Sequence, residues 1–386
     1  MNPLAVAGNA GLLIALAHAS WWTVTSVVAL PRPSDGIGPT TRLRLVVVVP
    51  AHNEEAMLGD CIRSLRDAHT GSEREILVVA DNCNDDTAVV ARGLGATPIE
   101  RVDPERIGKS FALDFAIDHL TKRVVPPDAI LFVDADSTVS RTFFDAIERR
   151  LNAGARAVQV HYEAAPGSSP LGRLRRVALL LIHWSRPLGA SRLGLGTTFK
   201  GNGMALRWDV ASAGVGGQGL AEDAAMTLSL ADRGIAVEFE PGASVAGYMA
   251  QDYASARTQD DRWERGRFSL VPRAFATAGR TLARGNVAAA AGALEVGSLP
   301  LSLVVLLAVS GGALALLGQA SPMLALASVG FVGAYLVTGV SAARVPLSEL
   351  SALSAIPPYF AHKAGVYFRV LARPARGWQR TQRSEH

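Results

Sequence analysis

The chain has 386 residues and a net charge of +4, and because 49% of its residues are hydrophobic and only 19% charged, disorder is excluded as its dominant state. Its mean hydropathy of +0.22 is higher than soluble proteins usually show, so part of the chain is expected to lie in lipid. Two cysteines, Cys61 and Cys83, are too few for a disulfide scaffold or a structural zinc site. The arginines are dispersed and the sequence has no nucleic-acid-binding motif, so nucleic acid is not an expected partner.

Residues 1–30 are predicted to form an N-terminal transmembrane helix. Leu4 to Leu30 contain no Lys, Arg, Asp or Glu, and at ~1.5 Å per residue they are long enough to cross ~30 Å of hydrocarbon. A cleaved signal peptide is the alternative, because Ala17-His18-Ala19 resembles a cleavage site. The absence of a basic residue before the run, and its continuation past Ala19, favour the transmembrane helix.

Two further uncharged runs, Val296 to Leu317 and Pro322 to Ala343, predict a transmembrane helical hairpin within residues 286–345. A buried helical pair in a soluble core is the alternative. In residues 346–386 we expect an interfacial segment, from Glu349 to Arg373 with a break at Pro357-Pro358, and then a basic cytoplasmic tail.

The distribution of arginine orients the three expected spans. Basic residues gather on one side of them, namely Arg32, Arg42, Arg44, Arg273, Arg280, Arg284 and Arg344. Since positively charged loops stay inside, we expect a multi-pass protein of the cell (inner) membrane with residues 31–285 in the cytoplasm.

The middle region alternates strand-like and helix-like segments, which predicts an α/β domain. Expected strands lie at residues 45–49, 76–80, 130–133 and 155–162, and expected helices at 57–65, 84–93 and 111–120. In a doubly wound sheet, ligands bind at the carboxyl ends of the strands. We expect this domain to have two halves, at about residues 43–136 and about 137–270. A further amphipathic segment at 171–188 is expected either on the membrane surface or in a solvated bundle.

The strongest local motif is Asp134-Ala135-Asp136, directly after an apolar strand. Two carboxylates one residue apart can share a Mg²⁺ or Mn²⁺ ion that also binds a diphosphate, because these ions prefer hard oxygen ligands. A pair of solvated acids in a turn is the alternative for this motif taken alone.

Five other motifs accompany it in a fixed order. They are Pro50-Ala51-His52-Asn53-Glu54-Glu55, Asp81-Asn82, Gly108-Lys109 before the aspartate pair, and then Glu222-Asp223 and Gln259-Asp260-Asp261-Arg262-Trp263 after it. At this point the sequence resembles the family 2 glycosyltransferases, which have an A-type nucleotide-sugar (Rossmann-like) fold. It is most similar to the membrane-bound branch with D-x-D, E-D and Q-x-x-R-W motifs, which includes cellulose, chitin and hyaluronan synthases and ceramide glucosyltransferases.

The resemblance implies that the half at about residues 43–136 binds the nucleotide and that the half at about 137–270 is the acceptor half. It also implies a role for each motif residue. The residues that would bind the nucleotide-sugar are Pro50, Asn53, Glu54, Asp81, Lys109 and Asp134, and the metal would be bound by Asp134 and Asp136. Asp223 would be the general base, with Glu222 beside it. The acceptor and the leaving diphosphate would be bordered by Gln259, Arg262 and Trp263. Donors in this family are usually UDP-sugars, so the resemblance implies a hexosyltransferase that uses Mg²⁺ or Mn²⁺.

Chemically, an inverting transfer needs one base and positive charge near the leaving diphosphate, which these residues supply. We therefore expect a sugar to be moved to a hydroxyl of a membrane-associated lipid or lipid-linked glycan. Three spans can hardly enclose a passage for a glycan, so we expect one sugar, or very few, to be added. The alternatives are a processive synthase that exports through a partner or oligomer, and a polyprenyl-phosphate sugar synthase. Should Asp223 not be the base, Asp260 or Asp261 is the next candidate.

Overall fold

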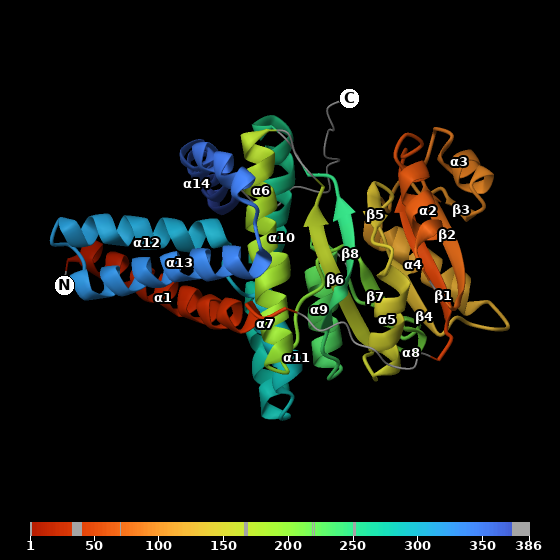
Figure 1. The fold of residues 1–386 in the computed structure, drawn as a ribbon, viewed down its shortest axis with the longest axis horizontal. Coiled ribbons are helices and arrows are strands. Elements are labelled where there is room, and N and C mark those ends of the chain that lie inside the picture. The colour runs from red at the N-terminus through yellow and green to blue at the C-terminus, as the bar shows by residue number, and fades with distance from the viewer. Residues whose placement is uncertain are drawn as a thin grey trace.

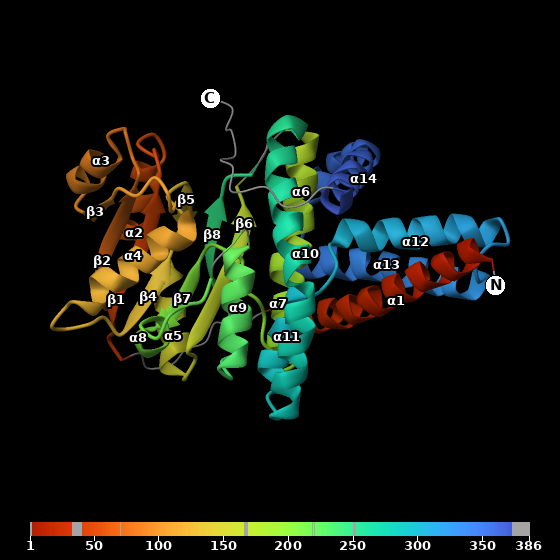
Figure 2. The same ribbon diagram turned by 180° about the vertical axis from the view of Figure 1, so that it is seen from behind.

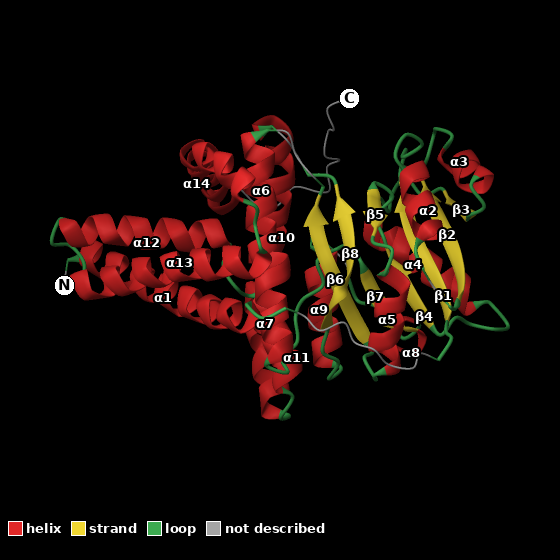
Figure 3. Ribbon diagram, in the orientation of Figure 1, coloured by secondary structure: helices red, strands yellow, loops and turns green. Residues whose placement is uncertain are grey.

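The computed structural model of this protein describes residues 2–32, 41–69, 71–165, 169–217, 219, 221–249 and 252–372. Figure 1 shows a sheet with its covering helices on one side and a bundle of long helices on the other. A wall of helices lies between these two parts (Figure 3). The basic tail expected at the C-terminus lies outside the described residues.

Eight strands form one sheet in the order β3-β2-β1-β4-β7-β6-β8-β5. Their bounds are β1 (Arg44–Ala51), β2 (Glu73–Asp81), β3 (Thr97–Arg101), β4 (Ala129–Phe132), β5 (Ser137–Val139), β6 (Ala157–Ala164), β7 (Met204–Arg207) and β8 (Glu238–Gly247). Strands β3, β2, β1 and β4 are parallel, with Val47 of β1 opposite both Ile76 and Leu131. Strand β7 runs antiparallel to both β4 and β6. The sheet is therefore mixed, and a purely doubly wound arrangement is wrong for the acceptor half.

Helices cover both faces of this sheet, which explains the uninterrupted apolar run in β1. They are α2 (Leu58–Asp67), α3 (Thr87–Gly93), α4 (Lys109–Thr121), α5 (Phe143–Asn152), α8 (Trp208–Ala211) and α9 (Glu222–Asp232). Val47 and Val49 belong to the core shared with α2 and α5. Val46 and Val48 belong to the core shared with α4 and α9. A strand that is buried on both faces needs apolar side chains at every position rather than at alternate ones.

Within the described residues, two helices are long and apolar enough to span a membrane: α1 (Pro3–Ala29) and α13 (Pro322–Ala343). A third span would have to combine α11 (Val287–Val296) with α12 (Leu301–Leu316), which are bent by 69° relative to each other. The straight helix expected from Val296 to Leu317 is thus wrong. Helix α11 ends at Gly297, and Pro300, which has no N–H to donate, adopts an extended conformation before α12.

Helices α1, α12 and α13 pack side by side through small and hydroxyl residues (Figure 1). The hydroxyl of Ser328 donates to the carbonyl of Leu12 at 2.8 Å. A Cβ at Gly311 would lie 2.5 Å from a side-chain carbon of Leu12. Close approach of backbones at small residues, with hydrogen bonds between helices, is typical of helix packing in membranes.

The wall between the two parts consists of α6 (Pro170–Leu180), a π-helical turn (Leu181–Ser185), α7 (Arg186–Arg192) and the long α10 (Tyr253–Ala283). Figure 2 shows α9 between the sheet and this wall. The arginines of the segment at 171–188 bind other protein groups: Arg175 pairs with Asp260 at 3.2 Å, and the Arg186 Nε donates to the hydroxyl of Tyr335 at 2.8 Å. These contacts hold the segment in the helical wall.

The C-terminal part of the described chain is a 3₁₀ helix (Leu347–Ala355) followed by α14 (Ile356–Ala372). Pro357 and Pro358 do not break this segment, because they lie in the first turn of α14, where an N–H is not needed. Lys363 of α14 is buried and pairs with Glu264 of α10 at 2.6 Å. The segment expected at the interface is thus a helix anchored to α10.

Candidate active site

A cavity of about 2100 Å³ lies between the sheet and the helical wall, and it brings together the predicted motifs. Its lining includes all the predicted site residues: Pro50, Asn53, Glu54, Asp81, Lys109, Asp134, Asp136, Glu222, Asp223, Gln259, Arg262 and Trp263. The carboxyl ends of β1, β2 and β4 open into it, as expected for ligand binding in an α/β sheet. Residues up to 213 positions apart in the sequence (Pro50 and Trp263) therefore share one site.

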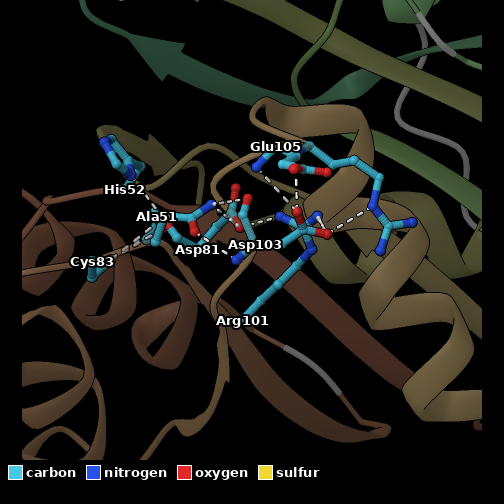
Figure 4. A network of polar contacts seen from close by, with 9 residues as sticks. Ala51, His52, Asp81, Cys83, Arg101, Asp103 and Glu105 are labelled. Carbon is cyan, nitrogen blue, oxygen red and sulfur yellow. Dashed lines mark hydrogen bonds and ion pairs between the residues drawn. The ribbon is translucent and has the colours of Figure 1, made fainter.

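We call the part of the cavity that the sequence predicts to bind the nucleotide the nucleotide end. It is formed where β1 and β2 end, and Figure 4 shows the polar network there. The Asp81 carboxylate is buried and accepts a hydrogen bond from Arg101 at 2.6 Å, and Arg101 also pairs with Asp103 at 3.1 Å. Burial raises the pKa of Asp81, and the Arg101 guanidinium opposes this effect. The ring Nδ1 of His52 lies 2.7 Å from the carbonyl oxygen of Asp81. Arg101 and Asp103, which orient Asp81, were not identified from the sequence.

Two asparagines shape the loops after these strands. Asn53 and Asn82 have φ values of 54° and 53°, in the left-handed region that asparagine tolerates better than most residues. The Asn53 side chain accepts a hydrogen bond from the N–H of Asn84 at 2.9 Å. The Asn82 side chain accepts one from the N–H of Asp103 at 2.7 Å. Asn53 therefore joins the two loops that border the nucleotide end of the cavity.

The two aspartates of the D-x-D motif directly follow β4. Asp134 pairs with Lys109 at the start of α4, and Lys109 also donates to the carbonyl of Gly201. Burial alone would lower the pKa of Lys109. The neighbouring carboxylates, foremost Asp134 and Glu222, more than offset this and raise it, so the ammonium stays charged.

Asn202 positions both aspartates and was not recognised as a site residue from the sequence. It is buried, its Oδ1 accepts from the N–H of Asp134 at 3.1 Å, and its Nδ2 donates to the hydroxyl of Ser137 at 2.8 Å. Ser137 in turn donates to Asp136 at 3.1 Å. The flanking glycines 201 and 203 have φ values of 83° and 65°, so this tight backbone path favours glycine. An asparagine between two glycines is the signal that was available in the sequence.

The donor atoms here fit a divalent cation only in part. Asp134 and Asp136 offer carboxylate oxygens, the hard ligands that Mg²⁺ and Mn²⁺ prefer. In the portion of the chain that is described, no group of three or more His, Cys, Asp and Glu side chains is arranged to hold a metal ion. Two carboxylates fit an ion that takes its remaining ligands from a diphosphate and water.

Glu222 and Asp223 begin α9 and face the cavity from the side opposite the nucleotide loops. Burial raises the pKa of both carboxyl groups. Asp223 lies next to the loop that contains Gly201 and Asn202, because a Cβ at Gly201 would be 3.5 Å from the Oδ2 of Asp223. A carboxylate with a raised pKa is a stronger proton acceptor than an ordinary one, as a general base requires.

The Q-x-x-R-W motif lies on α10. Gln259 accepts a hydrogen bond from Arg175 at 2.7 Å, and the Arg175 guanidinium carbon is 6.0 Å from the centre of the Trp263 ring. Arg262 lines the cavity and forms no ion pair with the residues that are described. Its guanidinium is therefore available to an anionic ligand. Arg175, which orients two of the three motif residues, was assigned to an amphipathic helix from the sequence.

The aspartates within this motif have structural partners. Asp260 is buried and pairs with Arg175 and with His362 at 3.2 Å each. Burial alone would raise the pKa of Asp260, but His362 and the cations around it lower it below the usual value. Asp261 pairs with Arg369 at 2.9 Å. Asp260 joins α10 to both α6 and α14, and Asp261 joins α10 to α14. Both carboxylates are therefore poor candidates for the base.

Comparison with known proteins agrees with this geometry. Residues 42–266, more than half of the chain, match the family described as Glycosyltransferase like family 2. The 4,4'-diaponeurosporenoate glycosyltransferase of Staphylococcus aureus (strain MRSA252) is 34% identical over 111 residues, which are 28% of this chain and 27% of that enzyme. The chain thus matches about a quarter of the length of this relative.

One solved structure supports the same fold, and a second has a weaker similarity. The mannosyltransferase PcManGT from Pyrobaculum calidifontis, in complex with GDP-Man and Mn²⁺, has a TM-score of 0.50 and 20% identity, over 86% of this chain and 97% of that chain. A glucosyl-3-phosphoglycerate synthase from Mycobacterium tuberculosis, in complex with Mn²⁺, UDP and glucosyl-3-phosphoglycerate, has a TM-score of 0.42 and 20% identity, over 60% and 80% of the two chains. The α/β fold with an A-type nucleotide-sugar domain is confirmed, and the chain belongs to the family 2 glycosyltransferases.

Proposed function

We propose that this glycosyltransferase is an inverting, metal-dependent enzyme of the membrane-bound branch, which transfers a sugar from a UDP-sugar to a hydroxyl of a lipid acceptor. One observation carries the proposal. The cavity that holds the nucleotide motifs continues between α12, α13 and α14, where its lining includes Leu301, Leu336, Val340 and Phe360. A water-soluble donor and an apolar acceptor can therefore meet in one site. The partial match to a 4,4'-diaponeurosporenoate glycosyltransferase supports a lipid-like acceptor.

The proposed reaction is a single displacement at the anomeric carbon of the donor sugar. The Asp223 carboxylate takes the proton of the acceptor hydroxyl as its oxygen forms a bond to this carbon. The bond from the carbon to the diphosphate oxygen breaks, and the electron pair leaves with the nucleoside diphosphate. Lys109 and Arg262 place positive charge beside the diphosphate as its negative charge develops. A divalent cation held by Asp134 and Asp136 would neutralise part of the same charge.

The other motif residues would position the substrates. The nucleoside would be bound by Asp81, which Arg101 orients, and by the loops that Asn53 joins. Pro50 and Glu54 line the cavity with them. Trp263 offers a flat apolar face to a sugar ring. Gln259 and Glu222 would border the acceptor and the base.

We expect the product to be a discrete glycolipid rather than a polymer. Two helices, or three if the bent pair counts as one span, are too few to enclose a polar passage for a glycan within one protomer. Purified protein, a radiolabelled UDP-sugar, Mn²⁺ and a bacterial lipid extract should give one or a few labelled spots on thin-layer chromatography. A ladder of long homopolymer would support a processive synthase instead, and a product whose label is released by mild acid from a polyprenyl phosphate would support a polyprenyl-phosphate sugar synthase.

For the membrane arrangement we propose that residues 1–30 and 286–345 span the cell membrane, that residues 31–285 lie in the cytoplasm, and that residues 346–386 follow as an interfacial segment and tail. A cysteine in place of Gln319, between α12 and α13, should then react with an impermeant maleimide added to intact cells. A cysteine in place of Lys122, an exposed residue that follows α4, should react only after lysis. Both variants need a background in which Cys83 is replaced by Ser, because that thiol is partly exposed. The reverse labelling pattern would contradict the orientation.

A further inference from the structure

Two cations in the cavity have no role in the reaction described above. Lys200 and Arg267 both line it. Neither side chain forms an ion pair or a hydrogen bond within the part of the chain that the structure describes, and the only bond made by Lys200 is from its backbone N–H to Gln159, at 2.8 Å. Burial lowers the pKa of Lys200 to about 8, so the ammonium still carries its charge near neutral pH. A half-buried cation without a partner is costly unless a ligand supplies the opposite charge.

These cations lie on the acceptor side of the site. Arg267 follows Arg262 by five residues on α10, which places it about 7.5 Å farther along the helix axis. Burial lowers the pKa of His183, in the π-helical turn of the wall, and the charge of Lys200 lowers it further, so the ammonium is close to the wall. The reaction proposed above already assigns Lys109 and Arg262 to the diphosphate.

The carboxylates near these cations have other functions or partners. Glu295 of α11 is 3.7 Å from the Arg186 guanidinium, which matches its charge. Asp223 is the proposed base, and both cations act on it electrostatically. Among the described residues, Lys200 and Arg267 therefore have no ion-pair partner of their own, although Glu295 and Asp223 act electrostatically on Lys200.

Beyond this charged region the cavity is lined by apolar side chains. Leu301 and Val305 come from α12, Leu336 and Val340 from α13, and Ile356 and Phe360 from α14. The bend between α11 and α12 brings Pro300 to the same wall. We call this region the apolar limb.

We propose that Lys200 and Arg267 bind the headgroup of an anionic lipid acceptor, which carries a phosphate or carboxylate group next to its reactive hydroxyl and places its hydrocarbon chains in the apolar limb. The inference rests on the proposed transferase function and narrows its acceptor class. Guanidinium and ammonium groups are the usual partners of phosphate and carboxylate oxygens. A neutral lipid with the same chains would leave both cations unmatched.

The test compares lipids that differ only in the headgroup. Purified full-length protein in detergent is mixed with dioleoyl phosphatidylglycerol or with dioleoylglycerol, and bound lipid is counted by native mass spectrometry. Both lipids have hydroxyl groups and identical chains, but only the first has a phosphate. We expect phosphatidylglycerol to bind about tenfold more tightly, the effect of one hydrogen bond to a charged group. Equal binding of the two lipids would overturn the proposal.

Substitutions then locate the effect. Lys200→Met and Arg267→Gln should each reduce this roughly tenfold preference about threefold, because the two cations share it. Lys200→Arg should retain it. Lys122→Met, at an exposed lysine on the sheet domain, is the matched control and should change nothing. UDP binding, measured by calorimetry, should be the same in all four variants. Weaker UDP binding with unchanged lipid preference would assign the two cations to the diphosphate and overturn the proposal.

A transfer assay separates failure of this inference from failure of the proposed function. Labelled product from a total lipid extract is passed over an anion exchanger, which retains acidic glycolipids and lets neutral ones through. Product that is only neutral would refute the anionic acceptor and leave the transferase intact. Selective binding of phosphatidylglycerol, reduced in Lys200→Met, together with no sugar transfer to any lipid, would refute the proposed function and leave the lipid site.

Discussion

Replacement of Asp223 by Asn should lower the turnover number about 10²- to 10⁴-fold, the usual contribution of a general base. The amide has nearly the same shape as the carboxylate but cannot take the proton of the acceptor hydroxyl. Donor binding should survive, because Asp223 lies in the acceptor half of the cavity while the nucleoside loops follow β1 and β2. A transfer assay beside calorimetry for UDP separates the two effects.

Glu222→Gln is the matched control, because both carboxylates begin α9 and both are buried. Its loss of turnover should be much smaller than that of Asp223→Asn. A larger loss in Glu222→Gln would assign the base to Glu222. Asp260→Asn should instead reduce stability in thermal unfolding, since Asp260 neutralises buried Arg175 and lies near Lys363.

The pH dependence provides an independent check on the base. Because burial raises the pKa of Asp223, its ionised form is present above that raised pKa and is lost as the pH falls through it. The acid limb of kcat/KM should therefore lie at a higher pH than an ordinary aspartate, with a pKa of about 3.9, would give. In Asp223→Asn this limb should disappear from the residual activity. A limb that is unchanged in the variant would belong to another group.

Removal of the second carboxylate of the D-x-D motif should have the other large effect. Asp136→Asn should reduce turnover at least about 100-fold, because the variant keeps only one of two negatively charged carboxylate ligands for the cation. Folding should survive, since the Asp136 side chain is partly exposed and the amide oxygen can still accept the hydrogen bond from Ser137. Calorimetry should show that Mn²⁺ strengthens UDP binding in the unmodified protein and no longer does so in the variant.

Chelation gives the matched measurement on the unmodified chain. Excess EDTA should abolish transfer, and added Mn²⁺ or Mg²⁺ should restore it. Asp60→Asn, at an exposed aspartate paired with Arg63 on α2, is the control and should behave like the unmodified protein. Full activity in EDTA would remove the metal from the mechanism. The aspartate pair would then serve only to hold Lys109 beside the diphosphate.

The sequence alone determined the features that depend on local pattern. The apolar run of β1 predicted a strand correctly, and the helical spacing around Cys61 and Ile62 predicted a helix correctly. Burial on both faces of a strand, or on one face of a helix, leaves a characteristic spacing of apolar residues in the sequence. This spacing can be recognised without knowing which element packs against that face. The order of the motifs identified the glycosyltransferase family. The uncharged runs located α1 and α13, since length and absence of charge suffice to recognise an apolar helix.

Tertiary structure decided everything that depends on partners distant in the chain. The antiparallel insertion of β7 between β4 and β6 follows from pairing across the sheet, which no strand pattern specifies. The positions of Arg175 and Asn202 became clear only when α10 and β4 were placed beside them. The bend before α12 depends on how α11 packs, although Pro300 was visible in the sequence. Lys200 and Arg267 are 67 positions apart and looked like scattered cations in the sequence. Folding places both in one cavity, where neither has an ion-pair partner among the described residues, because electrostatic matching depends on distance in space and not along the chain.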